Sequence, residues 1–358
     1  MNNKAVIAMS GGVDSSVAAY LMKQRGFDCI GVTMKLFANE DIGISREHSC
    51  CSLDDVEDAR SVAYSLDMPY YVFNFSDRFE TDVIDRFIHA YENGITPNPC
   101  IDCNRYLKFD KLYMRAKELD RDYVVTGHYA RVEKDENGRF LLKKALDDTK
   151  DQSYVLYCLT QEQLSHTIFP LGEMRKSQAR EIAESQGFIN ARKADSQDIC
   201  FVQNGSYADF IEQYTGKNYP DGDFLDTNGN VIGRHKGVIR YTVGQRKGLG
   251  ISAPEPLYVK AVNPVSNTVT LSYNDGLYSS VVKAGDINLI SVPEIKGEMR
   301  VKAKVRYRHT EQWATVTQNG ETLTAVFDEP QRAVTCGQAL VLYDGDIVVG
   351  GGTIIEVE

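Results

Sequence analysis

The chain has 358 residues, and 40 Lys or Arg against 50 Asp or Glu give it a net charge of −10. At about 150 residues per domain, this length predicts two or three domains, and a content of 42% hydrophobic residues excludes a disordered chain. The negative charge means that any affinity for nucleic acid must come from local basic patches. Apolar stretches stay well below the roughly 18 residues that cross a bilayer. We therefore expect a soluble cytoplasmic protein without a membrane partner.

The first half of the chain alternates short apolar runs with amphipathic stretches, which predicts a parallel sheet wrapped by helices. In chain order, strands are predicted over 4–9, 29–36, 70–75 and 123–126, and helices over 13–25, 54–66, 79–91, 104–119 and 176–186. A strand pair is predicted over 129–142 around the turn at Asn137 and Gly138.

The pattern changes after about Asp198, where helical periodicity fades and Gly, Asp and Asn turns appear. Beyond Gly276, short alternating strands with turns at 319–320, 344–345 and 350–352 predict a small β-barrel or sandwich. We expect a catalytic α/β domain over 1–203, a small central domain over 204–276 and a C-terminal β-domain over 277–358.

A nucleotide signal lies between the first predicted strand and the first predicted helix, in the string SGGVDSS from Ser10 to Ser16. Backbone N–H groups and the positive end of a helix hold phosphate oxygens at such a turn. The Ser hydroxyls add donors, and Asp14 offers a hard oxygen ligand for Mg²⁺. The kinase-type pattern GxxxxGK[ST] is absent. The alternative interpretation is a plain turn with a serine helix cap.

The same string resembles the PP-loop of the ATP pyrophosphatase superfamily, whose members cleave ATP between the α- and β-phosphates. That resemblance implies adenylation of an oxygen, which turns it into a good leaving group. Two other functions stay open on this motif alone. One is adenylation of a small metabolite, and the other is a non-catalytic RNA-binding module that keeps nucleotide as a switch.

The second chemical signal is the CxxC string of Cys100 and Cys103, with a third thiol at Cys200. With no secretion signal and only eight cysteines, these residues point to chemistry rather than to a disulfide scaffold. Cys103 precedes a predicted helix, where a thiol pKa falls. A zinc half-site, a dithiol redox pair, an iron-sulfur cluster on all three cysteines, and persulfide sulfur transfer are the four possible uses.

Several further strings, taken together, make the whole chain resemble the tRNA-specific 2-thiouridylase family. That family has an N-terminal ATP pyrophosphatase domain, a small central domain and a C-terminal β-barrel. It thiolates the wobble uridine of certain tRNAs. The strings that carry the resemblance are SGGVDSS, TPNPCIDCNRYLKF, TGHYAR, KDQSYVLY, DSQDICFV, GQRKGLG, RYR and FDEPQRAVTCGQ.

The resemblance assigns roles position by position. It implies that Cys103 is the catalytic nucleophile and that Cys200 carries the persulfide. ATP contacts are implied for Ala8, Met9, Ser10, Gly11, Gly12, Val13, Asp14, Ser15, Met34 and Gly127. Contacts to the target base are implied for Asn98, Pro99 and Cys100, and contacts to tRNA for His128, Lys150, Asp151, Gln152, Arg306, Tyr307 and Gln338.

The implied reaction is an ATP-dependent sulfur transfer to carbon 2 of a uridine in the anticodon loop. ATP and Mg²⁺ adenylate the carbon 2 oxygen, pyrophosphate leaves, and a persulfide loaded by a separate donor protein supplies the sulfur. AMP departs as Cys103 and Cys200 form a disulfide. The residue at position 100 differs from the family pattern, because many members have Asp where this chain has Cys100. That change leaves the proton shuttle unassigned and keeps an iron-sulfur cluster open as the alternative cofactor.

A strictly alternating basic segment over 301–308 predicts a strand face whose side chains are about 6.6 Å apart, near the spacing of nucleic-acid phosphates. A solvated barrel face is the other interpretation, and the basic cluster of Arg240, Arg246 and Lys247 has the same ambiguity. Trp313 is predicted to serve packing. Cys29, Cys158 and Cys336 are expected to be small core residues, and Cys50 and Cys51 stay unassigned.

Overall fold

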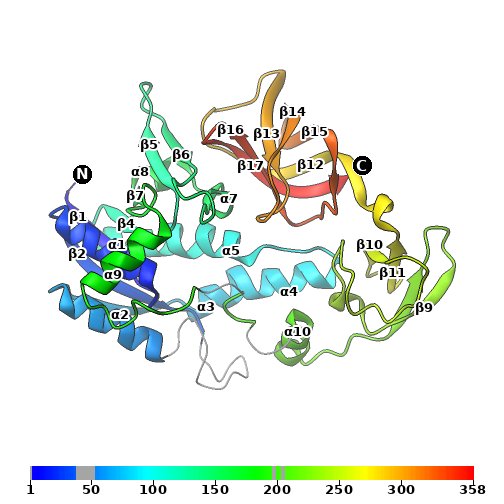
Figure 1. The fold of residues 1–358 in the computed structure, drawn as a ribbon, viewed down its shortest axis with the longest axis horizontal. Coiled ribbons are helices and arrows are strands. Elements are labelled where there is room, and N and C mark those ends of the chain that lie inside the picture. Colours follow the sequence, from blue (N-terminus) through cyan, green and yellow to red (C-terminus); the bar gives the residue numbers. More distant parts are fainter. Residues whose placement is uncertain (1, 38–52, 196–198, 203–205) are drawn as a thin grey trace. The chain divides into compact units, whose positions relative to one another are not determined.

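The computed structural model describes residues 2–37, 53–195, 199–202 and 206–358 (Figure 1). The described chain forms two compact units. The first comprises Met1–Ile84, Pro99–Asn204 and Gly345–Val349, and the second comprises Asp85–Asn98, Gly205–Asp344 and Gly350–Glu358. No helix in the described ranges is long and apolar enough to cross a membrane.

A five-stranded parallel sheet forms the centre of the first unit, in the order β3-β2-β1-β4-β7. Its central strand is buried on both faces, with Ala5, Val6 and Ile7 fully buried, because helices cover both sides. Ile7 pairs with Gly31 on one side and with Val125 on the other. The strands are β1 (Lys4–Ala8), β2 (Asp28–Lys35), β3 (Tyr70–Asn74), β4 (Tyr123–Val125) and β7 (Thr167–Ile168).

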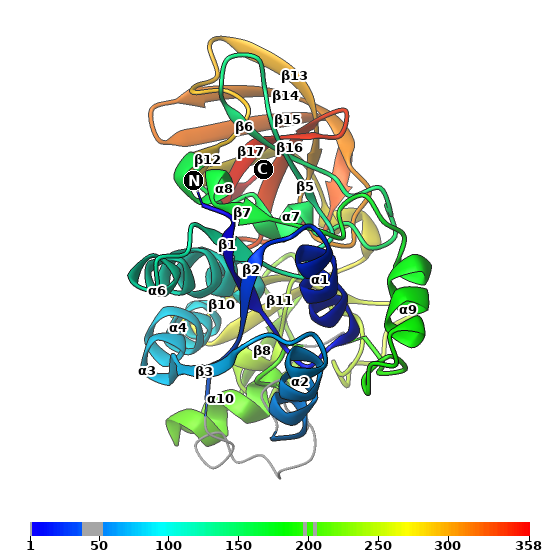
Figure 2. The same cartoon turned by 90° about the vertical axis from the view of Figure 1, so that its left-hand side faces the viewer.

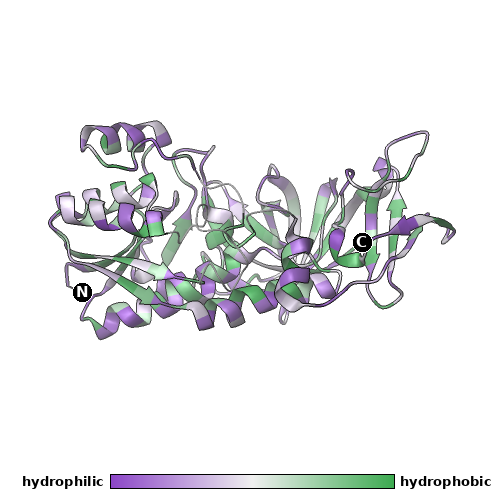
Figure 3. Ribbon diagram, turned by 90° about the horizontal axis from the view of Figure 1, so that it is seen from below, coloured by the Kyte–Doolittle hydropathy of each residue, from purple (hydrophilic) through white to green (hydrophobic). Residues whose placement is uncertain are grey.

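Helices lie on both faces of this sheet (Figure 2). On one face are α1 (Val13–Gln24), α2 (Leu53–Ser65) and α9 (Lys176–Ser185), and on the other are α3 (Ser76–Phe79) and α6 (Leu112–Glu118). Hydrophobic residues run along the strands and alternate with hydrophilic residues along the helices (Figure 3). The predicted α/β class with a parallel sheet is confirmed.

Short elements that the sequence did not predict complete the first unit. They are α7 (Ser153–Leu156), α8 (Gln161–Ser165) and strand β7. The predicted strand pair is confirmed as the hairpin of β5 (Arg131–Lys134) and β6 (Phe140–Lys143), with Gly138 at φ +86° in its turn.

The helix that carries the CxxC string begins earlier than predicted. It runs from α5 (Pro99–Asp102) through the π-helical segment η2 (Cys103–Lys111) into α6. The predicted start at residue 104 is wrong because proline, which disrupts the interior of a helix, is favourable in the first helical position, where no N–H donor is needed. Cys100 therefore lies in the first turn, and Cys103 lies inside the helix rather than before it.

The predicted helix over 79–91 is also part of a longer helical stretch. This stretch runs from α3 through the π-helical segment η1 (Glu80–Ile84) into α4 (Asp85–Glu92). The division between the units falls at the start of α4. The ring of Phe87 in α4 lies 6.5 Å from that of Phe210 in α10 (Tyr207–Thr215), and both belong to the second unit.

A four-stranded sheet in the order β10-β11-β8-β9 follows α10 in the second unit. Its core includes Phe224, Tyr241 and Val259. The elements are β8 (Gly222–Leu225), β9 (Val231–His235), β10 (Tyr258–Asn263), β11 (Thr268–Ser272) and the 3₁₀ turns η3 (Val238–Arg240) and η4 (Asn274–Leu277).

The C-terminal strands form a closed β-barrel, because β12 pairs with both β15 and β17. The strands are β12 (Tyr278–Leu289), β13 (Glu298–Lys304), β14 (Gln312–Asn319), β15 (Thr322–Arg332), β16 (Ala339–Asp344) and β17 (Ile347–Val357). The barrel confirms one of the two predicted β architectures and the turns at 319–320 and 344–345.

Two predictions about the barrel strands are wrong. The glycines at 350–352 lie inside β17 rather than in a turn, and a Cβ on Gly350 would lie 2.4 Å from the main-chain oxygen of Asn288. Glycine is thus required by close strand approach at the barrel closure. The basic strand ends at Lys304, four residues before the predicted end, because the chain turns where the His309 N–H donates to the Arg306 carbonyl.

Candidate active site

A glycine-serine turn joins the carboxyl end of β1 to α1. Gly11 has a φ of +73°, and a Cβ at this position would lie 2.4 Å from the main-chain oxygen of Asp55. Only glycine fits there. Gly12 is the cap residue of α1, and no side chain among the described residues caps this helix end. The first-turn N–H groups and the positive end of the helix dipole can therefore receive an anion.

The three serines of the turn have different positions. Ser15 and Ser16 are buried, and each hydroxyl donates to the Gly12 carbonyl at 3.0 Å. Ser15 also accepts from the Ser10 N–H at 3.2 Å. Ser10 is exposed. Two of the predicted phosphate donors thus shape the turn, and the hydroxyl of the exposed Ser10 lies 3.4 Å from that of Ser15.

The neighbouring strands bring two further predicted ATP residues to this edge of the sheet, since carboxyl ends of parallel strands share one edge. Met34 lies near the end of β2 and is half-buried. Gly127 follows β4, and a Cβ there would lie 2.7 Å from both the carbonyl carbon of Asp14 and the nitrogen of Ser15. The absence of a side chain at Gly127 lets the chain pack directly on the start of α1.

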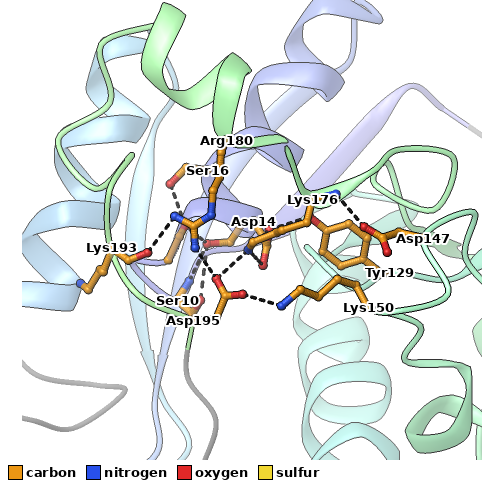
Figure 4. A network of polar contacts seen from close by, with 12 residues as sticks. Ser10, Asp14, Ser16, Tyr129, Asp147, Lys150, Lys176, Arg180, Lys193 and Asp195 are labelled. Carbon is orange, nitrogen blue, oxygen red and sulfur yellow. Dashed lines mark hydrogen bonds and ion pairs between the residues drawn. The ribbon is translucent and has the colours of Figure 1, made fainter. Parts of the chain in front are cut away.

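Asp14 in the first turn of α1 has two partners from distant parts of the sequence (Figure 4). The Lys176 ammonium lies 2.7 Å from each of its carboxylate oxygens, and the Tyr129 hydroxyl donates to Oδ1 at 2.9 Å. Burial and the Asp14 charge raise the pKa of Tyr129, so its proton stays on the phenol oxygen. Lys176 begins α9, and its main-chain N–H donates to Asp147 at 2.9 Å.

Asp195 is surrounded by three cations (Figure 4). Lys150 lies 2.8 Å, Lys176 2.9 Å and Arg180 2.8 Å from its carboxylate oxygens. Desolvation opposes ionisation of Asp195, but hydrogen bonds from Lys150 and Lys176 outweigh it and lower its pKa to about 2. The carboxylate is therefore ionised at neutral pH.

The segment after α9 is tied to the glycine-serine turn and to α2. Asn190 is buried and donates to the Gly11 carbonyl and to Ser16, both at 2.9 Å. Lys193 lies 2.6 Å from Asp55 and 2.7 Å from Asp58. Burial of Lys193 disfavours its charged form, but these two hydrogen bonds outweigh that effect and raise its pKa.

The CxxC thiols have different environments on one helix. Cys100 is exposed in the first turn and Cys103 is buried. The adjacent Asn104 side chain donates to the Val155 carbonyl at 3.0 Å and fixes this part of the helix against α7. Cys103 also begins the π-helical segment, a local irregularity that is frequent at functional sites.

Cys200 is half-buried, and its neighbour Phe201 is fully buried. The Phe201 ring lies 5.7 Å from that of Phe79 in α3. Helix α3 also contacts η2, the segment that begins at Cys103. The two predicted catalytic cysteines thus lie on segments that pack against the same short helix.

The remaining described cysteines fit structural roles. Burial raises the pKa of Cys29 to about 11 and that of Cys158 to about 12, so both thiols stay protonated. Cys336 is half-buried, and burial raises its pKa as well. Cys50 and Cys51 lie outside the described residues. All six described cysteines are free thiols.

An iron-sulfur cluster needs three or four ligands that converge on one point. Within the described ranges, no three His, Cys, Asp or Glu side chains are grouped so that they could hold a metal ion. The environments of Cys100, Cys103 and Cys200 therefore give the cluster alternative no support.

The predicted tRNA contacts of the first unit have internal partners. His128 is buried, and its Nδ1 lies 2.7 Å from the Thr126 hydroxyl. Burial lowers its pKa well below the usual range, so the ring is neutral. Asp151 accepts from the Ser153 hydroxyl at 2.7 Å, and Gln152 accepts from the Tyr129 N–H at 2.9 Å. Their contacts to tRNA stay predictions.

Of the tRNA contacts predicted in the second unit, Gln338 lies beside the predicted base contacts. Gln338 donates to the carbonyls of Thr96 and Pro97 at 2.9 and 3.1 Å, immediately before Asn98. Arg306 donates to the Val243 carbonyl at 3.0 Å. The exposed fraction of Tyr307 is 38%. Gln338 thus fixes the two residues that precede Asn98, the first of the predicted base contacts.

Trp313 is partly exposed on the barrel. Its exposed fraction is 48%, and the centre of its ring lies 5.2 Å from the Arg300 guanidinium and 5.6 Å from the Lys302 ammonium. On β14 Trp313 is paired with Lys302 of β13, and the prediction that it serves packing stays a prediction.

Sequence reasoning missed the polar and charged residues around Asp14, namely Tyr129, Lys176, Arg180 and Asp195. One signal was available. Lys176 and Arg180 are four residues apart on one helix face, and Lys176 lies in the first turn, where a positive charge opposes the helix dipole. An unfavourable charge at that position indicates a function other than helix stability.

Comparison with known families first defines the class of protein. A family model described as the tRNA methyl transferase HUP domain matches residues 3–204, one described as the tRNA methyl transferase PRC-barrel domain matches 208–273, and one described as the aminomethyltransferase beta-barrel domain matches 279–354. The fold and the glycine-serine turn define a HUP-type nucleotide-binding protein with two β-domains.

Full-length relatives define the family. The chain is 52% identical to tRNA-specific 2-thiouridylase MnmA of Clostridioides difficile (strain 630), over 99% of this chain and 98% of that protein. It is 51% identical to the protein of the same name from Lachnoclostridium phytofermentans, over 99% of both chains. The chain belongs to the tRNA-specific 2-thiouridylase family.

Proposed function

We propose that this protein is a tRNA 2-thiouridylase, an ATP-dependent sulfurtransferase that acts on carbon 2 of the wobble uridine. The observation that carries the proposal is the combination, in one unit, of an anion-receiving turn after β1 with Cys103 and Cys200 on segments that pack against α3. Family membership supports the same substrate and reaction. Adenylation of a small metabolite would need neither thiol.

The first step is activation of the uridine. The carbon 2 oxygen attacks the α-phosphate of ATP, and the bond between the α- and β-phosphates breaks. Pyrophosphate leaves, and the oxygen now carries AMP. The turn from Ser10 to Gly12 and the N-terminus of α1 hold the phosphates, and Gly127 and Met34 line the same edge. Asp14 is the carboxylate in this turn suited to Mg²⁺.

The second step is transfer of sulfur. A separate donor protein loads Cys200 as a persulfide. The terminal sulfur attacks carbon 2, AMP leaves, and the Cys103 thiolate then attacks the Cys200 sulfur, which releases the thiocarbonyl and leaves a Cys103–Cys200 disulfide. Alternatively, Cys103 attacks the persulfide first and releases hydrosulfide, which attacks carbon 2. In both cases a two-electron reductant must restore the thiols.

Recognition of the base requires the uridine to leave the anticodon stack, which an unpaired loop allows at low cost. Asn98, Pro99 and Cys100 are the proposed base contacts, supported by the hold of Gln338 on the two preceding residues. The tRNA contacts proposed for His128, Lys150, Asp151, Gln152, Arg306, Tyr307 and Gln338 rest on the family resemblance.

We further propose domain limits of 1–203, 204–276 and 277–358. The ranges of the three family models support these limits. The second compact unit holds both the central and the C-terminal domain, and two segments are grouped differently from these limits. Asp85–Asn98 is grouped with the second unit, through contacts such as that of Phe87 with Phe210, and Gly345–Val349 is grouped with the first.

The proposal is tested by incubating the protein with ATP, Mg²⁺, a persulfide donor and unmodified tRNA, and measuring 2-thiouridine and AMP. Wild type is expected to form both, and C103S and C200S are expected to form no 2-thiouridine. C336S is the matched control. Cys336 is half-buried, as Cys200 is, but it lies in the second unit. Equal thiolation by wild type and C103S, or no thiolation by wild type, contradicts the proposal.

A further inference from the structure

The cations around Asp195 outnumber the carboxylates that they pair with. Lys150, Lys176 and Arg180 form side-chain ion pairs with two carboxylates of the described residues, Asp14 and Asp195. Asp195 receives all three cations on two oxygens. Three cations thus converge on the two oxygens of one carboxylate, an arrangement that also suits the several oxygens of a phosphate chain.

The position of Lys176 makes a purely structural role costly. The exposed fraction of its side chain is 11%, and it lies in the first turn of α9, where the helix dipole disfavours a positive charge. Burying an ammonium group also costs desolvation energy. Both costs are offset when the group binds an anion.

These cations are held next to the phosphate-receiving turn. Lys176 contacts Asp14, the second residue of α1. Arg180 also donates to the Lys193 carbonyl at 3.2 Å, in the segment whose Asn190 donates to the Gly11 carbonyl. The turn has no lysine of the kinase-type loop. The cluster supplies, from other parts of the chain, the positive charge that the motif lacks.

We propose that Lys176 and Arg180 bind the β- and γ-phosphates of ATP and the pyrophosphate that leaves, and that Asp195 is an internal anion that occupies these two cations until nucleotide displaces it. The inference rests on the proposed ATP-dependent function and adds the residues that stabilise its leaving group. Phosphate oxygens accept the same charge-assisted hydrogen bonds as a carboxylate, so the exchange leaves each cation paired. Release of Lys176 also frees Asp14 for Mg²⁺.

The first test measures binding of ATP, pyrophosphate and AMP to the full-length protein by calorimetry. K176M keeps the length of the side chain and removes its charge. Losing one charge-assisted hydrogen bond to a phosphate is expected to weaken ATP and pyrophosphate binding by roughly 10- to 100-fold. AMP binding should change much less. R192A is the matched control, because the exposed fraction of Arg192 is 91% and its partner is Glu184 rather than Asp195.

The second test uses Asp195 and predicts the opposite sign. D195N removes the competing negative charge and keeps the shape of the side chain, so ATP and pyrophosphate should bind more tightly than to wild type, by roughly threefold to tenfold. If the network only supports the fold, D195N should weaken ATP binding or leave it unchanged. The thermal midpoint of each variant shows whether it is folded.

Three outcomes overturn the inference. One is equal loss of ATP and AMP binding in K176M, which means that Lys176 supports the site as a whole. The second is ATP and pyrophosphate binding by K176M at the wild-type level. The third is ATP binding by D195N that is not tighter than that of wild type. If wild type binds ATP and yet forms no 2-thiouridine, the proposed function fails while this inference is judged on binding alone.

Discussion

The Lys176 ammonium lies 2.7 Å from both carboxylate oxygens of Asp14, and the two residues are 162 positions apart in the sequence. The same ammonium lies 2.9 Å from Asp195. Lys176 thus keeps one carboxylate partner if the other is neutralised. This shared pairing connects α9 to the start of α1 beside the glycine-serine turn.

We predict that D14N and D195N destabilise the first unit non-additively. Each single variant leaves Lys176 one carboxylate and should lower the free energy of unfolding by less than about 2 kcal/mol, whereas the double variant leaves a buried ammonium uncompensated and should cost more than the sum. Denaturant unfolding of the four proteins measures this coupling. Additive losses would contradict the shared pairing.

Gly127 provides a test of the close approach to α1. A Cβ in G127A would lie 2.7 Å from the Asp14 carbonyl carbon, so we expect the turn to shift, ATP binding to weaken by at least about tenfold and the thermal midpoint to fall. G285A is the matched control, since a Cβ at Gly285 meets its nearest atom at 3.6 Å. Unchanged ATP binding by G127A would show that the turn tolerates the displacement.

The environments of the cysteines predict an order of alkylation. Brief treatment with iodoacetamide should modify the exposed Cys100 first, and Cys29 and Cys158 last, because burial holds their pKa values at about 11 and about 12. Peptide mass spectrometry gives the modified fraction of each residue. Fast labelling of Cys158 in the native protein would be inconsistent with its burial.

His128 predicts a dependence of stability on pH. Burial lowers its pKa well below the usual 6.5, so the folded state binds fewer protons than the unfolded state. Its contribution to stability is therefore complete above about pH 6.5 and is lost below it, at up to about 1.4 kcal/mol per pH unit.

Other histidines contribute to the same pH dependence, because burial also lowers the pKa values of His235 and His309. The comparison is therefore between wild type and H128Q, with the thermal midpoint measured from pH 7.5 to 5.5. We expect the midpoint of H128Q to fall less over this range. Parallel curves would show that His128 is protonated equally in both states.

Strong periodicity made the α/β unit predictable. The strand-turn-helix around SGGVDSS and the strands 29–36 and 70–75 appear close to where they were predicted, because short apolar runs that alternate with amphipathic stretches are typical of a parallel sheet with helices. The helix start at Pro99 was missed because Pro, Asn and Cys suggest a loop, and only the neighbouring structure shows that proline takes the first helical position.

The charged cluster could not be assembled from the sequence. Asp14, Lys150, Lys176 and Asp195 come from separate elements, and pairing between distant charges has no local signature. The role of the glycines at 350–352 could not be predicted from the sequence either, because glycine is required there by the close approach of a strand that lies far away in the sequence. The motif residues were identifiable because the turn and its chemistry occupy one short string.

The central claim is that Cys103 and Cys200 act as a pair in sulfur transfer. It is tested most directly by a single turnover without reductant, followed by non-reducing peptide mapping and nucleoside mass spectrometry. We predict one Cys103–Cys200 disulfide for each 2-thiouridine formed, starting from the free thiols seen here. Formation of 2-thiouridine while both cysteines remain free, or a disulfide from Cys103 to another cysteine, would contradict the account.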